Sequence, residues 1–200
     1  MKVTGGEARS WDVWQDPARC RDLTEALGDP ANVFGGEWPG WMPEFKSVLD
    51  VGCGQGVYYP LLSSHGAFYT GMDTSEPMLE LARSRFPGVA FGPGDLLDRL
   101  PCEDAAFEMV FCNAVLIHLP TLPLAELRRP AARWACYNLY VGEHTFAAPQ
   151  AGGEILQVWD LARVYAKALD GRHAEVVEES PVVVGGRDCW TWRVLEEVRP

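Results

Sequence analysis

The sequence predicts an α/β fold: a doubly wound, mostly parallel, seven-stranded sheet with an antiparallel hairpin at its carboxyl end. Three observations lead to this prediction. From residue 46 onward, short apolar runs alternate with segments of helical spacing, which is typical of strands joined by helices. The first of these runs is continuous, as in parallel strands that are buried on both faces. Near the end of the chain, two β-rich runs are separated by Gly185 and Gly186, which indicates a hairpin.

The expected elements begin with a strand at residues 47–51, an apolar run that ends directly in glycines. The helix at 75–86 has the clearest signals, because Ser75 can cap it, Pro77 fits its first turn and its apolar residues share one face. The remaining elements continue the alternation. They are a helix at 57–65, strands at 67–72, 89–92 and 107–112, a helix at 122–134, a strand at 135–141, a helix at 155–169, and hairpin strands at 174–184 and 188–198.

The charge balance argues against nucleic acid and membrane surfaces as partners. Seventeen Lys and Arg residues against 28 Asp and Glu residues give a net charge of −11. Nucleic acids and anionic membrane surfaces are bound by clustered Lys and Arg residues, so we expect neither as a partner.

The chain has no apolar stretch of the ~18 residues that span a bilayer, and residues 1–7 lack the apolar core of a signal peptide, so a soluble, cytoplasmic protein is expected. The six cysteines form no Cys-x-x-Cys pair, so reduced thiols and no metal site are expected.

The most informative segment is a glycine loop directly after the first strand. It contains Gly52, Gly54 and Gly56, which let the chain turn sharply and let a ligand touch the backbone. This spacing differs from the Gly-x-Gly-x-x-Gly of dinucleotide-binding proteins. Asp50 lies just before the loop and would repel a phosphate, whereas it suits a ligand with an ammonium or sulfonium group. The segment therefore favours a cationic ligand over a pyrophosphate.

Residues 49–56 resemble motif I of the class I S-adenosylmethionine-dependent methyltransferases. The similarity continues in chain order through residues 71–78, 94–96, 100–110 and 112–119, and covers roughly residues 46–145. It implies a Rossmann-like methyltransferase fold, S-adenosyl-L-methionine as cofactor, and transfer of its methyl group to a small-molecule acceptor. The sequence departs from the family before the fifth strand, where Arg129 and Pro130 stand in place of the usual Pro-Gly-Gly turn. That departure concerns the turn from helix to strand, not the cofactor site.

The resemblance also implies a set of cofactor-binding residues. Asp73, at the end of the second strand, would accept hydrogen bonds from both ribose hydroxyls, and the alternative is a cap for the next helix. Asp95 would accept a hydrogen bond from the adenine amino group, and the alternative is a turn-forming Asp. Met78 would cover adenine or belong to the core. The full set is Asp50, Gly52, Cys53, Gly54, Gly56, Asp73, Thr74, Met78, Asp95, Leu96 and Asn113.

Two histidines are candidates for catalysis. His118 lies in the segment that leads out of the fourth strand, and its alternative role is a capping or packed histidine. His144 and Glu143 follow the fifth strand and are expected at the ligand-binding edge of the sheet, with Glu143 contacting substrate. The alternative for this pair is an exposed loop.

Composition changes near residue 46, which divides the chain into a segment 1–46 and a methyltransferase domain 47–200. The first segment holds half of the eight tryptophans and a helix at 16–27. The four tryptophans are Trp11, Trp14, Trp38 and Trp41. We expect this segment to cap the methyl-transfer site, with Trp14 as a substrate contact, and the alternative is that its tryptophans pack behind the sheet.

Two rival functions remain, a nicotinamide-dependent oxidoreductase and a non-catalytic module that binds the cofactor. A monomer or homodimer is expected.

Overall fold

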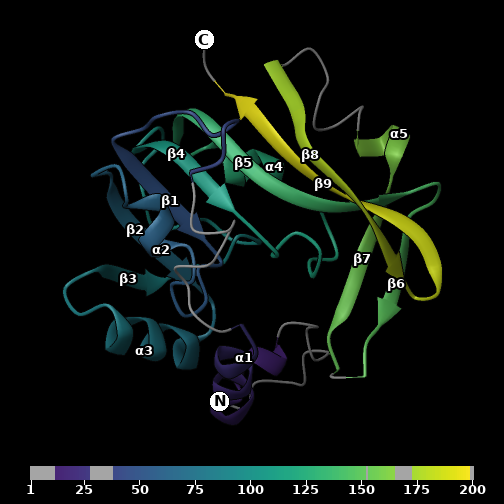
Figure 1. Cartoon of the computed structure of the whole chain (residues 1–200), viewed down its shortest axis with the longest axis horizontal. Helices are drawn as coiled ribbons and strands as arrows, with labels where there is room; N and C mark the ends of the chain where they lie inside the picture. The colour runs from purple at the N-terminus through teal and green to yellow at the C-terminus, as the bar shows by residue number, and fades with distance from the viewer. Residues whose placement is uncertain (1–11, 28–37, 152, 165–172, 199–200) are drawn as a thin grey trace, which may run out of the picture.

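A computed structural model describes residues 12–27, 38–151, 153–164 and 173–198. In this part of the chain, nine strands form one sheet in the order β3-β2-β1-β4-β5-β7-β6, with β9 beside β5 and β8 beside β9 (Figure 1). The strands are β1 (Ser47–Val51), β2 (Phe68–Asp73), β3 (Ala90–Pro93), β4 (Phe107–Cys112), β5 (Ala131–Gly142), β6 (Phe146–Pro149), β7 (Ile155–Asp160), β8 (His173–Val184) and β9 (Arg187–Glu197). The helices are η1 (Asp12–Gln15, 3-10), α1 (Pro17–Leu27), α2 (Tyr59–Leu62), α3 (Glu76–Arg85), α4 (Leu124–Arg128) and α5 (Leu161–Val164).

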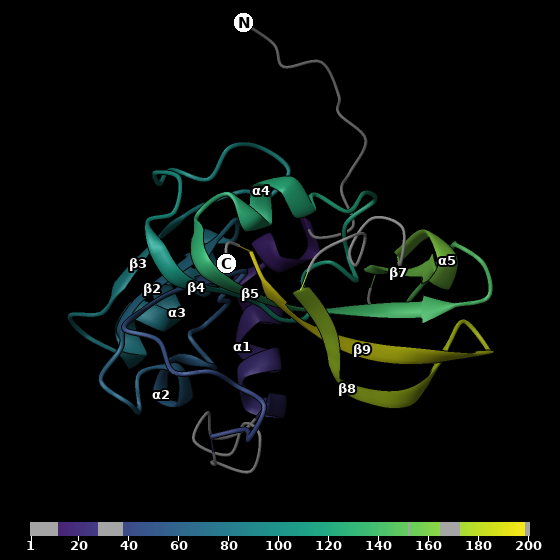
Figure 2. The same cartoon turned by 90° about the horizontal axis from the view of Figure 1, so that it is seen from above.

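The sheet is mostly parallel and doubly wound, as the sequence predicts. β1, β2, β3, β4, β5 and β7 pair in parallel, whereas β8 and β9 form the expected antiparallel hairpin. Side chains alternate between two cores. Val110 of β4 packs in the core that contains Leu127 of α4, and Phe111 packs in the core that contains Leu62 of α2. In Figure 2, α4 and α2 lie on opposite sides of the sheet, so both faces are covered.

The prediction of a helix at 155–169 is wrong over its first part. Ile155–Asp160 is strand β7, and within the described residues only Leu161–Val164 is helical. The reason is tertiary. The pairing of β4 with β5 ends at Cys112 and Tyr137, so the last residues of β5 have an open edge, which β7 occupies. The hairpin of β6 and β7 thus adds two strands to those expected, and in Figure 1 it runs toward α1.

Two expected helices are shorter than the sequence suggests. α2 has four residues and α4 has five. α4 ends before Pro130, which has no N–H to continue the helical bonding, and residues 131–134 join β5 instead. The Arg129 guanidinium holds the turn, because it pairs with Glu126 at 2.7 Å and with Asp104 at 2.9 Å and donates to the Leu100 carbonyl at 2.9 Å. An ion-pair cluster therefore supports the turn at which the sequence departs from the family pattern.

The amino-terminal elements agree with local signals. Asp16 caps the first turn of α1, since its carboxylate accepts the Ala18 N–H at 2.9 Å. Residues 38–46 run along one face of the sheet, where Trp38 and Trp41 pack against the core of Phe45, Val48 and Leu62. None of the described helices combines the length and the apolar character needed to cross a bilayer.

Candidate functional site

A cavity of about 340 Å³ lies where β1, β2 and β4 end. That volume is within the range of small-molecule sites. The cavity brings together eleven of the residues predicted from the sequence, which come from five separate segments of the chain. They are Trp14; Gly52, Cys53 and Gly54; Asp73, Thr74 and Met78; Asp95 and Leu96; and Asn113 and His118.

The three glycines of the loop differ in their surroundings. All have positive φ angles, +73° at Gly52, +54° at Gly54 and +76° at Gly56. A Cβ at Gly52 would lie 2.1 Å from the Val115 side chain, and one at Gly56 would lie 3.0 Å from Phe91. A Cβ at Gly54 would meet no protein atom within 4 Å, and Gly54 lines the cavity. Gly52 and Gly56 are thus required by packing, whereas Gly54 leaves the backbone open to a ligand.

Asp73 is held rigidly at the end of β2. Its Oδ2 accepts the Gly54 N–H and its Oδ1 accepts the Ser75 N–H, each at 2.8 Å. A carboxylate has about four acceptor positions, so both oxygens can accept further hydrogen bonds from a ligand. Burial raises the pKa of Asp73 above its ordinary value of 3.8, and backbone hydrogen bonds from Ser75, Gly54 and Thr74 oppose that rise. The alternative role as helix cap falls to Ser75, whose Oγ accepts the Met78 N–H at 3.2 Å.

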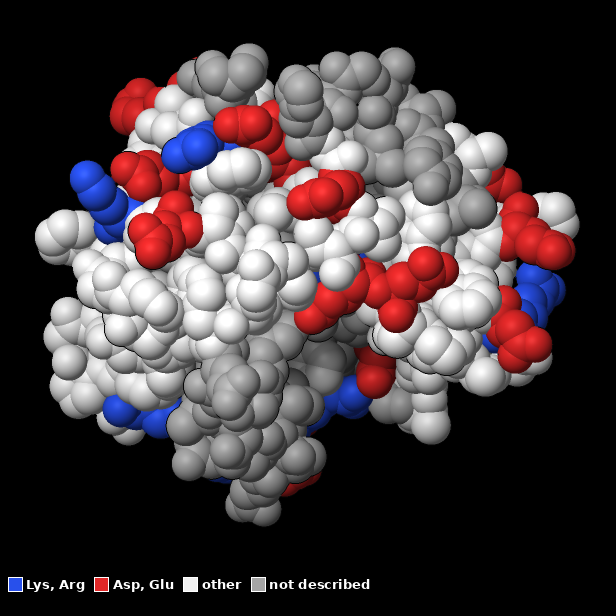
Figure 3. Space-filling view, turned by 45° about the horizontal axis from the view of Figure 1, so that its top comes forward, with Lys and Arg blue, Asp and Glu red and all other residues white. Residues whose placement is uncertain are grey.

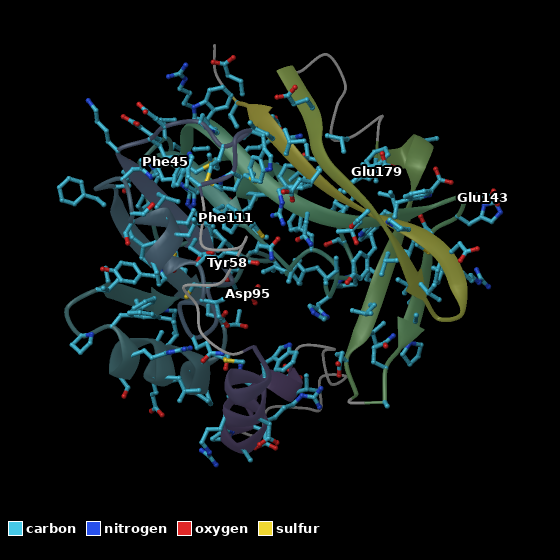
Figure 4. The ribbon with its side chains drawn as sticks, in the orientation of Figure 1. Phe45, Tyr58, Asp95, Phe111, Glu143 and Glu179 are labelled. Atoms are coloured by element: carbon cyan, nitrogen blue, oxygen red, sulfur yellow. The ribbon has the colours of Figure 1, made fainter. Side chains whose placement is uncertain are left out.

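Asp95 combines the two roles considered for it. Its Oδ1 accepts the Leu97 N–H at 2.9 Å, which is a turn-forming bond, and the residue also lines the cavity. In Figure 4, Asp95 and Tyr58 lie near each other at the centre of the molecule. The turn fixes the carboxylate where it can accept a hydrogen bond from a ligand.

Asp50 is not brought to the cavity. It is 1% exposed and accepts the Tyr69 hydroxyl at 2.7 Å. Burial raises the pKa of Asp50 to about 7, against the effect of that hydrogen bond. The carboxyl group therefore lies beneath the glycine loop, where it braces β1 against β2, and does not face a ligand directly.

Trp14 and His118 lie together at the cavity. Their ring centres are 6.4 Å apart in an edge-on arrangement. The Arg19 guanidinium lies 4.9 Å from the Trp14 ring centre and pairs with Glu154, just before β7, at 2.5 Å. Burial lowers the pKa of His118 below 6.5, against a backbone hydrogen bond with Ile155 that raises it, so the imidazole is neutral at pH 7. The amino-terminal segment, the segment after β4 and the residue before β7 thus come together near one end of the cavity.

Glu143 and His144 do not line the cavity. In Figure 4, Glu143 lies at the far edge of the molecule, away from Tyr58 and Asp95. The expectation placed them at the ligand-binding edge because parallel strands usually end together. β5 has twelve residues and its pairing with β7 extends to Gly142, beyond the end of β4, so the following loop emerges elsewhere.

Several residues of the cavity were not predicted. Tyr58 is the N-cap residue of α2, directly after the glycine loop, and that position in the sequence could have marked it as a cavity residue. Ala114 has a φ of +58°, and Asn138 of β5 holds it there by accepting its N–H at 2.6 Å. A non-glycine residue in this conformation costs roughly 1 kcal/mol. No local pattern marks that position.

These features fit S-adenosyl-L-methionine. Carboxylate oxygens of Asp73 and Asp95 lie at the cavity and are acceptors of the kind that ribose hydroxyls and an adenine amino group would need, Gly54 opens the backbone, and Met78 adds apolar contact area.

A family model described as a methyltransferase domain matches residues 48–135. Malonyl-[acyl-carrier protein] O-methyltransferase of Erwinia pyrifoliae is 39% identical over 84 residues, which are 41% of this chain and 32% of that protein. Trans-aconitate 2-methyltransferase of Variovorax paradoxus is 37% identical over 107 residues, 52% of this chain and 40% of that protein. The chain thus matches about a third to two fifths of the length of these curated relatives.

Two solved structures share the fold. A SAM-dependent methyltransferase of Methanosarcina mazei superposes with a TM-score of 0.62 at 18% identity, over 80% of this chain and 97% of that one. The putative methyltransferase in a Haloferax volcanii complex with the Trm112 methyltransferase activator gives a TM-score of 0.65 at 17% identity, over 98% and 100%. Residues 48–135 thus match a methyltransferase domain, and the chain shares its fold with SAM-dependent methyltransferases of known structure.

Proposed function

We propose that this chain transfers the methyl group of S-adenosyl-L-methionine to an oxygen atom of a small-molecule acceptor. The observation that carries the proposal is the pairing of Gly54 and Asp73. The loop backbone opens into the cavity at Gly54, and the Gly54 N–H holds the Asp73 carboxylate at its edge. The name of the relative malonyl-[acyl-carrier protein] O-methyltransferase supports oxygen as the attacked atom.

When bound, the cofactor would supply an electrophilic methyl group: a lone pair of the acceptor oxygen would form the new O–CH3 bond as the CH3–S bond breaks, and the sulfur would keep the bonding electrons and leave as S-adenosylhomocysteine. The chain has to hold both reactants in line, exclude water and accept the hydroxyl proton where the acceptor loses one. Asp73 and Asp95 orient the nucleoside by accepting hydrogen bonds. His118 is neutral at pH 7 and lines the cavity, so it is the residue we assign to receive that proton.

Charge favours a small molecule over nucleic acid. On the face in Figure 3, acidic groups spread across the surface, whereas basic groups lie mainly toward its margins. The net charge of −11 agrees with that distribution. Phosphate backbones require clustered positive charge, so this surface supports a small-molecule acceptor.

The cap that we propose over the acceptor is narrower than residues 1–46. Trp14 lines the cavity, whereas Trp38 and Trp41 pack on the sheet face, which is the alternative considered for them. Trp11 and residues 28–37 lie outside the described residues. Arg19, held by Glu154, stacks on Trp14, and the Cys20 thiol donates to the Trp14 carbonyl at 3.1 Å. Residues 12–20 therefore carry the proposed cap.

Trp14→Ala is expected to reduce the rate of methyl transfer by about tenfold or more while S-adenosylhomocysteine affinity changes only a few-fold. The indole excludes water and orients the acceptor but is not needed to hold ribose. Turnover with labelled cofactor and calorimetric titration measure the two quantities. Trp190→Ala, at an exposed tryptophan of the terminal hairpin, is the matched control and should change neither. Equal rates for the two variants would remove Trp14 from the acceptor site.

Titration with S-adenosylhomocysteine and with NADH tests the proposed cofactor against the oxidoreductase alternative. We expect saturable binding of S-adenosylhomocysteine and none of NADH, because the spacing of Gly52, Gly54 and Gly56 differs from that of dinucleotide-binding proteins. Preferential binding of NADH would overturn the proposal.

A further inference from the structure

Asn113, at the end of β4, has its side-chain amide fixed in one orientation. Its Oδ1 accepts a hydrogen bond from Arg193 Nη1 at 2.8 Å, and its Nδ2 donates to the Tyr58 hydroxyl. Asn113 and Tyr58 both line the cavity. The amide oxygen is therefore turned toward β9, and the N–H side is what Asn113 offers to the cavity.

Arg193 is itself held from two other parts of the chain. It is 9% exposed, and its Nε donates to Glu178 Oε2 of β8 at 2.6 Å. Trp41 donates its indole N–H to the other oxygen of Glu178 at 2.9 Å, and the Arg193 guanidinium lies 5.6 Å from the Trp41 ring centre. The guanidinium is thus fixed by two hydrogen bonds, from Nε to Glu178 and from Nη1 to Asn113.

The same pair of strands also fixes the neighbouring backbone. Arg193 of β9 lies opposite Asn138 of β5, whose Oδ1 holds the Ala114 N–H. Side chains from β5 and β9 therefore set both the Asn113 amide and the left-handed turn at Ala114. A polar support of this kind costs more to bury than an apolar one, which favours a role in the site over one in packing alone.

We infer that Arg193 is a positioning residue that makes the β4 end of the cavity a hydrogen-bond donor to an oxygen of the bound ligand. This inference rests on the proposed function. An amide nitrogen has two hydrogens, and Tyr58 takes one of them. Without Arg193 the amide can turn over, since its oxygen and nitrogen are nearly equal in size, and would then present an acceptor. The ligand oxygen belongs either to the amino-acid carboxylate of the cofactor or to the acceptor.

Arg193→Leu tests the inference, because leucine keeps much of the apolar stem and removes every donor. Affinity is measured for S-adenosylhomocysteine and for 5′-methylthioadenosine, which retains the nucleoside and sulfur but lacks the amino-acid portion. If the oxygen is the cofactor carboxylate, S-adenosylhomocysteine binds about tenfold more weakly or worse and 5′-methylthioadenosine is unchanged. If it belongs to the acceptor, both affinities are unchanged and methyl transfer at saturating cofactor falls about tenfold. If the wild-type protein itself does not bind S-adenosylhomocysteine, the proposed function is refuted instead.

Three comparisons separate positioning from a structural role. Arg133→Leu, at an exposed arginine of β5 that pairs with Glu197, is the matched control and should change none of these quantities. In an Asn113→Ala background, Arg193→Leu should have no further effect, because it acts through Asn113. Arg193→Lys should restore only part of the effect, since one ammonium does not span both partners as a fork does. The inference is overturned by a folded Arg193→Leu variant that binds S-adenosylhomocysteine and 5′-methylthioadenosine more weakly to the same extent, or that changes neither the two affinities nor the rate of methyl transfer.

Discussion

Gly54→Val is expected to abolish detectable binding of S-adenosylhomocysteine while the protein remains folded. A Cβ at Gly54 would meet no protein atom within 4 Å and Gly54 lines the cavity, so we expect the valine side chain to occupy space that the ligand needs. Overpacking of a site costs about 3 kcal/mol at the upper end of its usual range, which is over ~100-fold in affinity. Calorimetric titration measures the loss, and a thermal melt reports folding.

The matched control for Gly54→Val is Gly66→Val. Gly66 also has a positive φ, +78°, and open space where a Cβ would lie, but it is an exposed residue away from the cavity. Both substitutions impose similar backbone strain, so only contact with the ligand distinguishes them. If the two variants bind S-adenosylhomocysteine equally well, the glycine loop is not the cofactor site.

Asp73→Ala is expected to weaken S-adenosylhomocysteine binding at least tenfold. Two hydrogen bonds from ribose to a charged acceptor are worth about 1.5–3 kcal/mol each. The substitution also removes the acceptor of the Gly54 and Ser75 N–H groups, so Asp73→Asn, which keeps one carbonyl oxygen, is the gentler companion variant. Asp98→Ala, at an exposed carboxylate outside the cavity lining, controls for the change in charge. Unchanged affinity in folded Asp73→Ala would remove ribose from the end of β2.

The pH dependence of binding follows from the same residue. Only the ionised carboxylate accepts from both hydroxyls on both oxygens, and burial raises the pKa of Asp73 above 3.8. Affinity should therefore begin to fall at a higher pH than for an ordinary aspartate as the solution is acidified. In Asp73→Asn that acid limb should disappear.

The sequence predicts those parts of the fold that depend on local signals. The cap at Ser75, the glycine pair 185–186 and the buried run of β1 each act within a few residues, and all three predict the observed elements. The run 155–160 has no such local signal. Its apolar residues suit a buried helix or a strand, and the open edge of β5 decides the outcome.

The same distinction between local signals and tertiary structure applies to the residues of the site. Residues of contiguous motifs, such as Gly54, Asp73 and Asp95, line the cavity as expected. Glu143 and His144 were placed by assuming that parallel strands end together, and the overrun of β5 breaks that assumption. The bond between Arg193 and Asn113 joins residues 80 positions apart. It depends on the pairing of β9 with β5 and so has no signature in local sequence.

Transfer of a labelled methyl group distinguishes a methyltransferase from a protein that only binds the cofactor. The full chain is incubated with S-adenosyl-L-methionine labelled in its methyl group and the small-molecule fraction of a cell extract. The label is followed by chromatography and mass spectrometry, and Gly54→Val serves as the inactive control. We expect label in a small oxygen-methylated product with the wild-type chain and none with the variant. A wild-type chain that binds S-adenosylhomocysteine yet transfers no label to any fraction would contradict the proposed function and would mark the chain as a cofactor-binding module without catalysis.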